Sequence, residues 1–289
     1  MTLLNEYLRE RFGCKVYKIA LNAGLTCPNR DGKLGFRGCI FCSEGGSGEF
    51  AGDASGSITE QIEDGKKLVS SKIKDGKFIA YFQAFTNTYA PVPVLRKVFF
   101  EAAKHPDIVA LSIATRPDCL PPGVLDLLEE LRSIKPVWVE LGLQTIHKKT
   151  ADYIRRGYDL DVYDKAVPEL NKRGIEVITH VILGLPGEDT GMMKETVKYV
   201  CDSGSGGIKL QLLHVLKGTD LEKDYLAGKF EVLTEDEYIN ILKECVRIIP
   251  ETTVIHRLTG DGDKKLLVAP LWSGDKKHMI NRIRKEVLT

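Results

Sequence analysis

Apolar and β-branched residues gather in seven short runs along the chain, and the stretches between them have a helical pattern. A short apolar run bounded by polar residues is typical of a buried strand. Successive runs lie roughly 30 residues apart, the length of a strand plus the crossover helix that a parallel neighbour requires. The sequence therefore predicts a parallel α/β fold, either a barrel or a doubly wound sheet. The predicted strands are residues 15–21, 78–84, 108–114, 137–143, 175–183, 208–214 and 253–258.

The stretches between the runs carry start signals and apolar stripes of amphipathic helices. Ser57 and Glu60 form a capping-box pattern that opens a helix predicted to reach Lys74. Apolar residues at helical spacing mark helices over residues 95–102 and 124–131. No linker rich in proline or serine divides the chain, so a single domain over residues 1–289 is predicted. Further helices are predicted at residues 161–173, 189–203, 234–249 and 276–288.

Charge and composition narrow the class of protein. The 289 residues include 41 Lys and Arg against 40 Asp and Glu, so no overall charge attracts the chain to nucleic acid or to an acidic membrane. No apolar run approaches the roughly 18 residues of a membrane span, and charges occupy the N-terminus where a signal peptide needs its apolar core. A cytoplasmic enzyme without a membrane partner is predicted. The seven cysteines are an odd number, which favours reduced thiols over disulfides.

Three of these cysteines, Cys27, Cys39 and Cys42, lie within sixteen residues of a glycine-rich loop. A structural zinc site needs four ligands, but the remaining cysteines are scattered singly and no nearby histidine completes a set. A [4Fe-4S] cluster has four irons, so three thiolates leave one iron free to bind a small molecule. We therefore predict a [4Fe-4S] cluster on these three residues, with a zinc-dependent nucleic-acid-binding protein as the alternative.

The loop "CPNRDGKLGFRGCIFC", with Phe41 just before its last cysteine, resembles the signature loop of the radical S-adenosylmethionine (radical SAM) superfamily. In that superfamily the open iron chelates S-adenosylmethionine, and an electron from the cluster cleaves it to methionine and a 5'-deoxyadenosyl radical. The resemblance implies a partial (β/α)6 TIM-type barrel of the radical SAM kind with a C-terminal extension, and a short seventh strand. It places the cluster at the C-terminal ends of the strands.

Further segments resemble one branch of the superfamily. The segments "GLQT", "RRGYD" and "VILGLPGE" look like the branch that contains coproporphyrinogen dehydrogenases and the Elongator catalytic subunit. The resemblance covers a core of about residues 15–215, which leaves about 216–289 as the C-terminal extension. "FGCKVYKIALNAGLTCPNRDG", "GCIFCSEGGSGEFAG" and "YFQAFTNTYAP" are most similar to a bacterial family implicated in maturing the wobble uridine of tRNA.

That family's implied reaction converts 5-carboxymethylaminomethyluridine towards 5-aminomethyluridine. The implied partners are tRNA and an electron donor such as flavodoxin or ferredoxin. A radical SAM enzyme that acts on a small-molecule metabolite shares the same cluster features and remains the alternative.

The resemblance also implies residues that bind S-adenosylmethionine. Phe41 lies near the adenine, and Thr86 and Asn87 correspond to groups that bind the amino group. Gln144 and Arg156 match positions that contact the methionine and ribose parts, and Arg156 suits the methionine carboxylate. His180 stands where that branch has an acidic residue that contacts the ribose. This chain therefore has a different side chain at the ribose contact. Each of these residues also has an ordinary alternative, as a packing, turn or surface residue.

Polar residues on the inward faces of the predicted strands are candidates for substrate chemistry. Period-two alternation places Glu140 and Gln144 on one face of their strand, where they need polar partners or a ligand. Cys119 follows the third strand and is either a small buried hydrophobe or a participant in chemistry. The C-terminal helix is basic, which suits either solvent or tRNA phosphates. The catalytic candidates are Glu140, Lys209, Gln211 and His256, with ion pairing as their alternative, and the basic residues are Lys276, Lys277, Arg282, Arg284 and Lys285.

Overall fold

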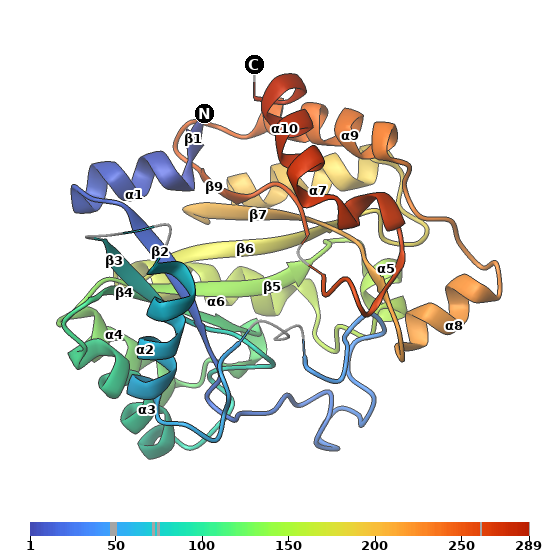
Figure 1. Cartoon of the computed structure of the whole chain (residues 1–289). Helices are drawn as coiled ribbons and strands as arrows, with labels where there is room; N and C mark the ends of the chain where they lie inside the picture. Colours follow the sequence, from blue (N-terminus) through green and yellow to red (C-terminus); the bar gives the residue numbers. More distant parts are fainter. Residues whose placement is uncertain (47–50, 71–72, 74–75, 261, 289) are drawn as a thin grey trace.

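A computed structural model describes the chain except for residues 47–50, 71–72, 74–75, 261 and 289 (Figure 1). Its centre is an eight-stranded sheet with the order β1-β9-β7-β6-β5-β4-β3-β2, in which every pair of neighbours is parallel. The strands are β1 (Thr2–Leu3), β2 (Val16–Leu21), β3 (Lys77–Phe82), β4 (Ile108–Thr115), β5 (Val137–Gln144), β6 (Glu176–Leu183), β7 (Gly207–Leu212) and β9 (Val254–Arg257).

Strands β2 to β7 lie side by side in chain order, with crossover helices between them, and the sheet curls into a partial barrel (Figure 1). This arrangement confirms the predicted fold class. All seven predicted strands are present, and β9 is the short seventh. The helices are α1 (Leu4–Phe12), α2 (Ile58–Val69), α3 (Val92–Lys104), α4 (Pro122–Arg132), α5 (Lys148–Tyr153), α6 (Leu160–Lys172), α7 (Thr190–Asp202), α8 (Asp220–Leu226), α9 (Glu235–Ile248) and α10 (Lys276–Glu286).

Some boundaries and short elements differ from the sequence prediction. Ser57 caps α2 as predicted, accepting a hydrogen bond from the Glu60 amide, but the helix ends at Val69. The predicted continuation to Lys74 falls in part outside the described residues. The pattern did not predict β1, α5, α8 or the antiparallel pair of β8 (Val215–Leu216) with β10 (Leu267–Ala269), because elements of two to seven residues show too little periodicity. It did not predict α1 either, which has nine residues.

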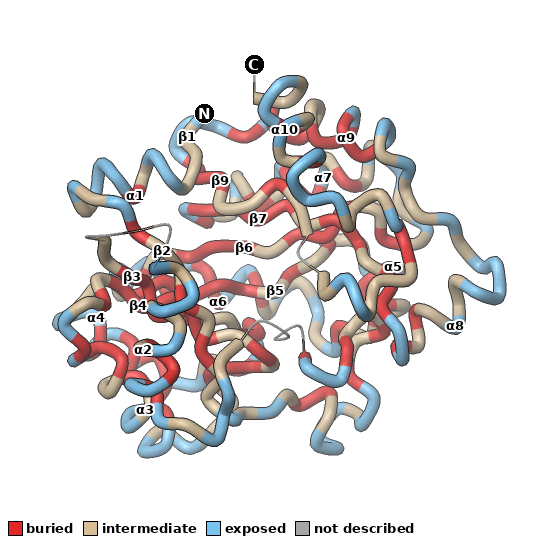
Figure 2. Tube along the Cα trace, in the orientation of Figure 1, coloured by how far each residue is buried: buried red, intermediate tan, exposed pale blue. Residues whose placement is uncertain are grey.

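The two faces of the sheet have different roles. The outer face packs against the helices in a continuous apolar core, which includes the fully buried Phe82, Leu111 and Leu141 (Figure 2). On the inner face a smaller apolar cluster, with Trp138 at its centre, packs against α1. Helix α1 therefore covers the N-terminal end of the barrel, and the polar inward residues lie between this floor and the loops at the C-terminal ends of the strands.

Candidate active site

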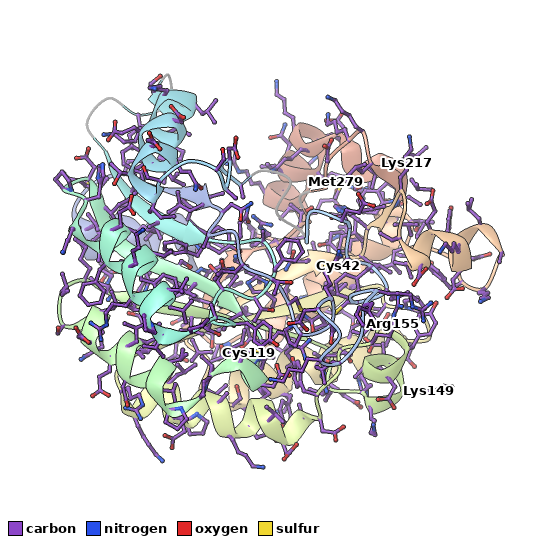
Figure 3. The ribbon with its side chains drawn as sticks, turned by 90° about the horizontal axis from the view of Figure 1, so that it is seen from below. Cys42, Cys119, Lys149, Arg155, Lys217 and Met279 are labelled. Atoms are coloured by element: carbon purple, nitrogen blue, oxygen red, sulfur yellow. The ribbon has the colours of Figure 1, made fainter. Side chains whose placement is uncertain are left out.

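A cavity of about 480 Å³ occupies the interior of the barrel. Its walls are the inward side chains of the strands, and the loop that follows β2 contributes Cys27, Cys39 and Cys42. Figure 3 shows Cys42 near the centre of the molecule, with Lys149 and Lys217 towards the edge. The structure thus brings the three predicted metal ligands to one cavity at the C-terminal side of the sheet.

The cysteine loop wraps around the side chain of Arg30. The Arg30 guanidinium donates to the carbonyl of Cys42 at 3.1 Å and also to the carbonyl of Ser43. Gly38 has a φ of +72°, and a Cβ there would lie 2.8 Å from Arg30 Nε. A side chain at this position would push the guanidinium away, so Gly38 is needed both for its backbone conformation and for its lack of a Cβ.

Polar groups also surround the sulfur of Cys39. Asn29 donates to Cys39 Sγ at 3.3 Å and to the carbonyl of Arg155 at 2.9 Å. Arg116 is buried, forms a two-point ion pair with Asp118, and donates to the carbonyl of Arg156 at 2.7 Å. Burial raises the pKa of Cys39 to about 12, and the neighbouring Cys42 adds to this while Arg116 opposes it. Cys39 is therefore a neutral thiol until a metal replaces its proton.

The spacing of the thiols bears on the zinc alternative. Four thiolates around one zinc ion, each about 2.3 Å from it, lie about 4 Å from one another. Among the described residues, three ligand atoms that all lie within 4.8 Å of one another occur at Glu63, His105 and Asp107, and not at the three cysteines. Thiols spread further apart around one cavity fit the wider [4Fe-4S] cluster better than a single ion.

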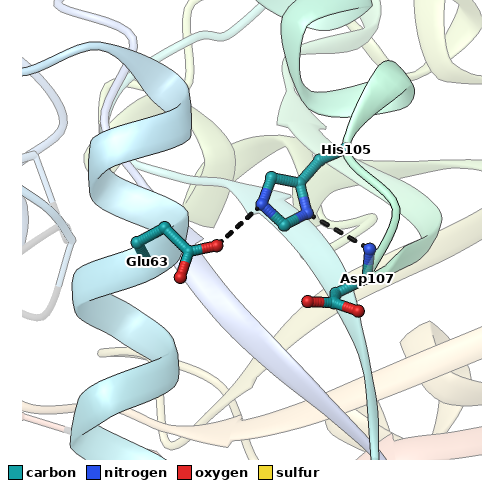
Figure 4. A group of neighbouring side chains, drawn as sticks. All are labelled: Glu63, His105 and Asp107. Carbon is teal, nitrogen blue, oxygen red and sulfur yellow. Dashed lines mark hydrogen bonds and ion pairs between the residues drawn. The ribbon is translucent and has the colours of Figure 1, made fainter.

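The compact Glu63, His105 and Asp107 group is an ion-pair network that joins α2 to the start of β4 (Figure 4). His105 Nε2 lies 2.9 Å from Glu63, and His105 Nδ1 accepts the Asp107 amide at 3.2 Å. The Lys66 ammonium already bridges Glu63 at 2.8 Å and Asp107 at 2.7 Å. Because Lys66 neutralises these carboxylates, the group stabilises the fold without needing a metal.

We expect Lys66→Met to lower the melting temperature at pH 7. Hydrogen bonds from Lys66 lower the pKa of Glu63 and of Asp107, so their contribution is present above the ordinary carboxyl pKa and is lost as the pH falls below about 4. The cost at pH 7 is up to about 1 kcal/mol. Thermal unfolding between pH 3 and 8 should show the difference from wild type vanishing at the acid end. Lys67→Met, which breaks an exposed pair with Asp64, is the control, and equal effects of the two substitutions would contradict this role.

Strained backbone surrounds the cavity. Among the described residues, four other than glycine have a left-handed φ: Ala84 at 72°, Phe85 at 57°, Gln144 at 67° and Arg155 at 57°. The first three line the cavity, and the fourth accepts the hydrogen bond from Asn29. Such conformations cost of order 1–3 kcal/mol each and concentrate at binding and active sites. Their grouping here, at the ends of β3 and β5, supports a binding role for this face.

The structure places five of the six predicted S-adenosylmethionine residues on the cavity wall: Phe41, Thr86, Gln144, Arg156 and His180. Asn87 is not among the described lining residues, and its Nδ2 donates to the carbonyls of Ala84 and Ala114, each at 3.0 Å. Asn87 thus braces the strained turn after β3. In the orientation that satisfies its hydrogen bonds, the Gln144 amide donates to the carbonyls of Gly142 and Leu143.

Arg156 is buried, and its guanidinium donates hydrogen bonds to backbone carbonyls of the chain. Its Nη1 donates to the carbonyls of Leu143 at 3.2 Å and Thr145 at 2.6 Å, and its Nε donates to the carbonyl of Tyr158 at 3.1 Å. The guanidinium also lies 4.5 Å from the centre of the Tyr158 ring. Arg156 therefore fixes the loop between β5 and α6, and its Nη2 is the part left to meet a ligand.

Glu140 lies at the centre of a buried polar network deeper in the barrel. Its side chain is fully buried and contacts the ammonium groups of Lys18, at 2.6 Å, and Lys209. It also accepts from Ser112 at 2.6 Å and lies 2.7 Å from His180 Nε2. Burial alone would raise the pKa of Glu140, but the two ammonium groups overcome this and hold it well below its usual value. Glu140 is therefore ionised.

His180 is neutral in this network. Burial, followed by the charge of Lys209, lowers its pKa to about 4. Its Nε2 faces a carboxylate, which only accepts, so Nε2 carries the proton. Its Nδ1 then accepts from Gln211 Nε2 at 3.2 Å. The structure thus joins three of the predicted inward residues, His180, Glu140 and Gln211, in one chain of hydrogen bonds.

Two other predicted features lie away from this network. Cys119 is buried, is not among the described lining residues, and its pKa is raised to about 12 by burial, which favours the reading as a small hydrophobe. On the basic helix α10, Arg282 forms ion pairs of 2.7 Å with three carboxylates, so its charge is already neutralised. Those three carboxylates belong to Glu235, Asp236 and Glu286.

The sequence reasoning missed Lys18, Arg30, Asn29 and Arg116. The same period-two alternation that selected Glu140 would have found Lys18, which lies between Val16 and Ala20 on the inward face of β2. Arg30 and Asn29 act through backbone and sulfur contacts within the loop, which no spacing reveals. Arg116 lies just past the end of β4, where loops carry site residues.

The family models agree with this geometry. Residues 27–200 match the model of the radical SAM superfamily, and residues 206–288 match that of the Radical_SAM C-terminal domain. The chain therefore belongs to the radical SAM superfamily, whose cofactors are a [4Fe-4S] cluster and S-adenosylmethionine. Among the described residues, no helix combines the length and apolar character that crossing a bilayer requires.

Several relatives resemble the chain over different lengths. It is 50% identical over 284 residues to the uncharacterized protein YtqA of Bacillus subtilis, covering 98% of this chain and 88% of that protein. It is 40% identical over 268 residues to protein YhcC of Escherichia coli, covering 92% of this chain and 85% of that protein. A tRNA uridine(34) acetyltransferase of Methanocaldococcus jannaschii is 29% identical over 56% of this chain and 30% of its own length.

Solved structures share the fold. The Elp3 of Methanocaldococcus infernus, with its N-terminus deleted, superposes with a TM-score of 0.70 at 19% identity, covering 95% of this chain and 64% of that chain. Methylornithine synthase (PylB) superposes with a TM-score of 0.54 at 14% identity, covering 87% of this chain and 67% of that chain. At these identities the likeness concerns the fold alone.

Proposed function

We propose that Cys27, Cys39 and Cys42 ligate three irons of the [4Fe-4S] cluster, and that S-adenosylmethionine binds the fourth. When bound, these cofactors supply a 5'-deoxyadenosyl radical, which removes a hydrogen atom from the substrate. The observation that carries this proposal is that three thiols from one loop line a single cavity without the tight spacing of a one-metal site. The Asn29 amide, which donates to Cys39 Sγ, would then hydrogen-bond a cluster ligand and adjust its reduction potential.

The residues around the strained turns would hold S-adenosylmethionine. Thr86 and the backbone of Ala84 and Phe85 lie on the wall beside the cysteine loop, where they suit the amino group. The Nη2 of Arg156, for which the described residues offer no hydrogen-bond partner, suits the methionine carboxylate, and Gln144 lines the same cavity. Phe41 would contact the adenine and His180 the ribose, while Asn87 would act through the turn that it braces.

The proposed substrate is the wobble uridine of tRNA. The chain would convert 5-carboxymethylaminomethyluridine towards 5-aminomethyluridine, and the 5'-deoxyadenosyl radical would begin this by taking a hydrogen atom from a carbon of the carboxymethylamino arm, forming 5'-deoxyadenosine. Support comes from the resemblance of the loop segments to the family that matures this base, and from a relative whose name places its activity at uridine 34 of tRNA. An electron donor such as flavodoxin or ferredoxin would reduce the cluster.

Mass spectrometry of tRNA nucleosides from a strain that lacks this gene tests the substrate. We expect the carboxymethylaminomethyl form to accumulate and the aminomethyl form to disappear at the wobble position. Re-expression of the wild-type chain should restore the pattern, and re-expression of Cys39→Ser should not. Unchanged wobble uridines would reject the tRNA substrate and favour a radical SAM enzyme that acts on a small-molecule metabolite.

A further inference from the structure

We propose that the inner half of the cavity is a carboxylate-binding site for the substrate, formed by Lys18, Lys209 and Arg257 around Glu140. This inference deepens the proposed function, because it assigns the part of the substrate that enters the barrel. It rests on the arrangement of side chains below the cysteine loop. Such a site would select substrates whose reacting arm ends in a carboxylate.

The inner half of the cavity has an excess of positive charge. Glu140 is the one carboxylate among the described residues that line the cavity. Lys18 and Lys209 both contact it, one at each oxygen. The same two ammonium groups lie over the ring of Tyr81, at 4.9 and 4.6 Å from its centre. One carboxylate thus already faces two cations before Arg257 is counted.

Arg257 is brought to this site by an irregularity in strand pairing. Strand β9 pairs with β7 as Val254 with Gly207 and Ile255 with Ile208, but the next partner of Lys209 is Arg257. The register shift leaves His256 as the extra residue, so Arg257 comes level with Lys209. Without the shift, alternation would place Arg257 on the opposite face from His256. Both residues instead line the cavity.

Arg257 has no counter-charge in the described part of the chain, where no carboxylate forms an ion pair with it. Its charge acts on the same network, since it lowers the pKa of both Lys209 and His180. His256 adds a buried Nδ1 that has no hydrogen-bond partner among the described residues. The described residues thus bring three cations, one anion and one polar atom without a hydrogen-bond partner to the cavity wall. An added anion would complete such a site.

The depth of the site favours a carboxylate arm over a backbone phosphate. Burial, with the charges of Lys18 and Arg257, holds the pKa of Lys209 well below its usual value. Lys18, Lys209 and Arg257 against Glu140 leave two positive charges in excess, so charge alone admits either anion and the depth of the site makes the distinction. Glu140 and Lys209 also lie in the middle of their strands, deeper than the cysteine loop. Only a slender arm of a larger substrate reaches them, while backbone phosphates stay outside.

Nuclear magnetic resonance can test the site without turnover. The chain has two tryptophans, and Trp138 lies beneath the site, with Lys18 Nζ 5.7 Å from its ring centre. Trp272→Phe assigns the indole ¹⁵N–¹H signal of Trp138. The reconstituted, unreduced protein with S-adenosylmethionine is titrated with the nucleoside 5-carboxymethylaminomethyluridine and with the analogue in which a neutral carboxamide replaces the carboxylate. We expect the acid to shift the Trp138 signal with an affinity at least about tenfold tighter than that of the amide.

Substitutions then test whether Arg257 causes the difference in affinity between the acid and the amide. Arg257→Met should bring the acid and the amide to within about twofold of each other, and Arg257→Lys should restore part of the difference. Lys217→Met, at an exposed position towards the edge (Figure 3), should behave as wild type. Equal affinities of acid and amide for the wild-type protein would overturn the carboxylate site, even if Arg257→Met fails to fold.

The test of the carboxylate site can fail or succeed independently of the test of the tRNA substrate. Acetate and acetamide at millimolar concentration serve as probes without a nucleoside. If wobble uridines are unchanged in the deletion strain but acetate still shifts Trp138 more strongly than acetamide does, the carboxylate site stands and the substrate is another carboxylate. If the wobble uridines change but neither pair of probes is discriminated, the tRNA proposal stands and the carboxylate site is rejected.

Discussion

Replacing Cys39 by serine is expected to abolish the cleavage of S-adenosylmethionine to 5'-deoxyadenosine. Cys39 is one of three thiols on the cavity wall, and losing one would leave the cluster with two protein ligands. We expect anaerobically reconstituted wild-type protein to hold about four irons per chain, and Cys39→Ser to hold far fewer. The rate of 5'-deoxyadenosine formation under a strong reductant should fall by at least about 100-fold. Iron analysis and chromatography of the nucleoside products measure both quantities.

Cys119→Ala is the matched control for this experiment. Cys119 is a cysteine near the same end of the sheet, but it is buried behind the cavity wall and has a neutral thiol. Its replacement should leave the iron content and the cleavage rate within about twofold of wild type. If Cys119→Ala retains its iron but loses activity, Cys119 takes part in the chemistry. If Cys39→Ser keeps four irons and cleaves at the wild-type rate, the assignment of the cluster loop is wrong.

Replacing Glu140 by glutamine is expected to have the largest effect on stability. Its fully buried side chain is the common partner of Lys18 and Lys209, and glutamine would leave the buried Lys209 ammonium and the half-buried Lys18 ammonium without a counter-charge. Breaking one side of a buried ion pair costs about 3–5 kcal/mol. We expect this loss in the free energy of unfolding at pH 7, measured by chemical denaturation. Because the pKa of Glu140 is held well below its usual value, the difference from wild type should shrink as the pH falls below about 4.

A double substitution separates this network effect from a packing effect. Lys209→Met removes one of the two cations, so adding it to Glu140→Gln should recover part of the lost stability. Glu176→Gln is a control at the start of the neighbouring strand, where Glu176 is partly exposed and pairs with Arg11. It should cost less than about 1 kcal/mol. Strict additivity of Glu140→Gln and Lys209→Met would show that the two groups do not interact as the structure describes.

The polar network accounts for the open space inside the barrel. A barrel interior is normally filled by apolar side chains, and here the layer around Trp138 above α1 is filled in this way. The next layer carries Lys18, Glu140 and Lys209, which keep the space polar and open towards the cysteine loop. Because buried cations are costly without partners, their presence beside the proposed radical site is more consistent with a ligand than with stability alone.

Much of the fold was predictable from the sequence, because it depends on local patterns. Period-two runs and helical stripes defined seven strands and seven helices, and the 30-residue repeat defined the parallel sheet. The capping box at Ser57 fixed the start of α2. The close spacing of Cys27, Cys39 and Cys42 identified the loop, since ligands for one cluster can come from neighbouring positions. These features need no knowledge of long-range contacts.

Only the tertiary structure could decide how distant side chains combine. The sequence predicted Glu140, His180, Lys209 and Gln211 as separate inward residues, but whether they meet depends on the stagger between strands. The alignment of Arg257 with Lys209 depends on a one-residue shift between β7 and β9, which alternation within a single strand does not encode. The bracing roles of Asn87 and Arg156 likewise depend on which carbonyls lie beside them. The sequence by itself thus determined the elements and the metal-binding loop, and the folded sheet alone determined the charge balance of the cavity, because that balance is the sum of side chains brought together from separate strands.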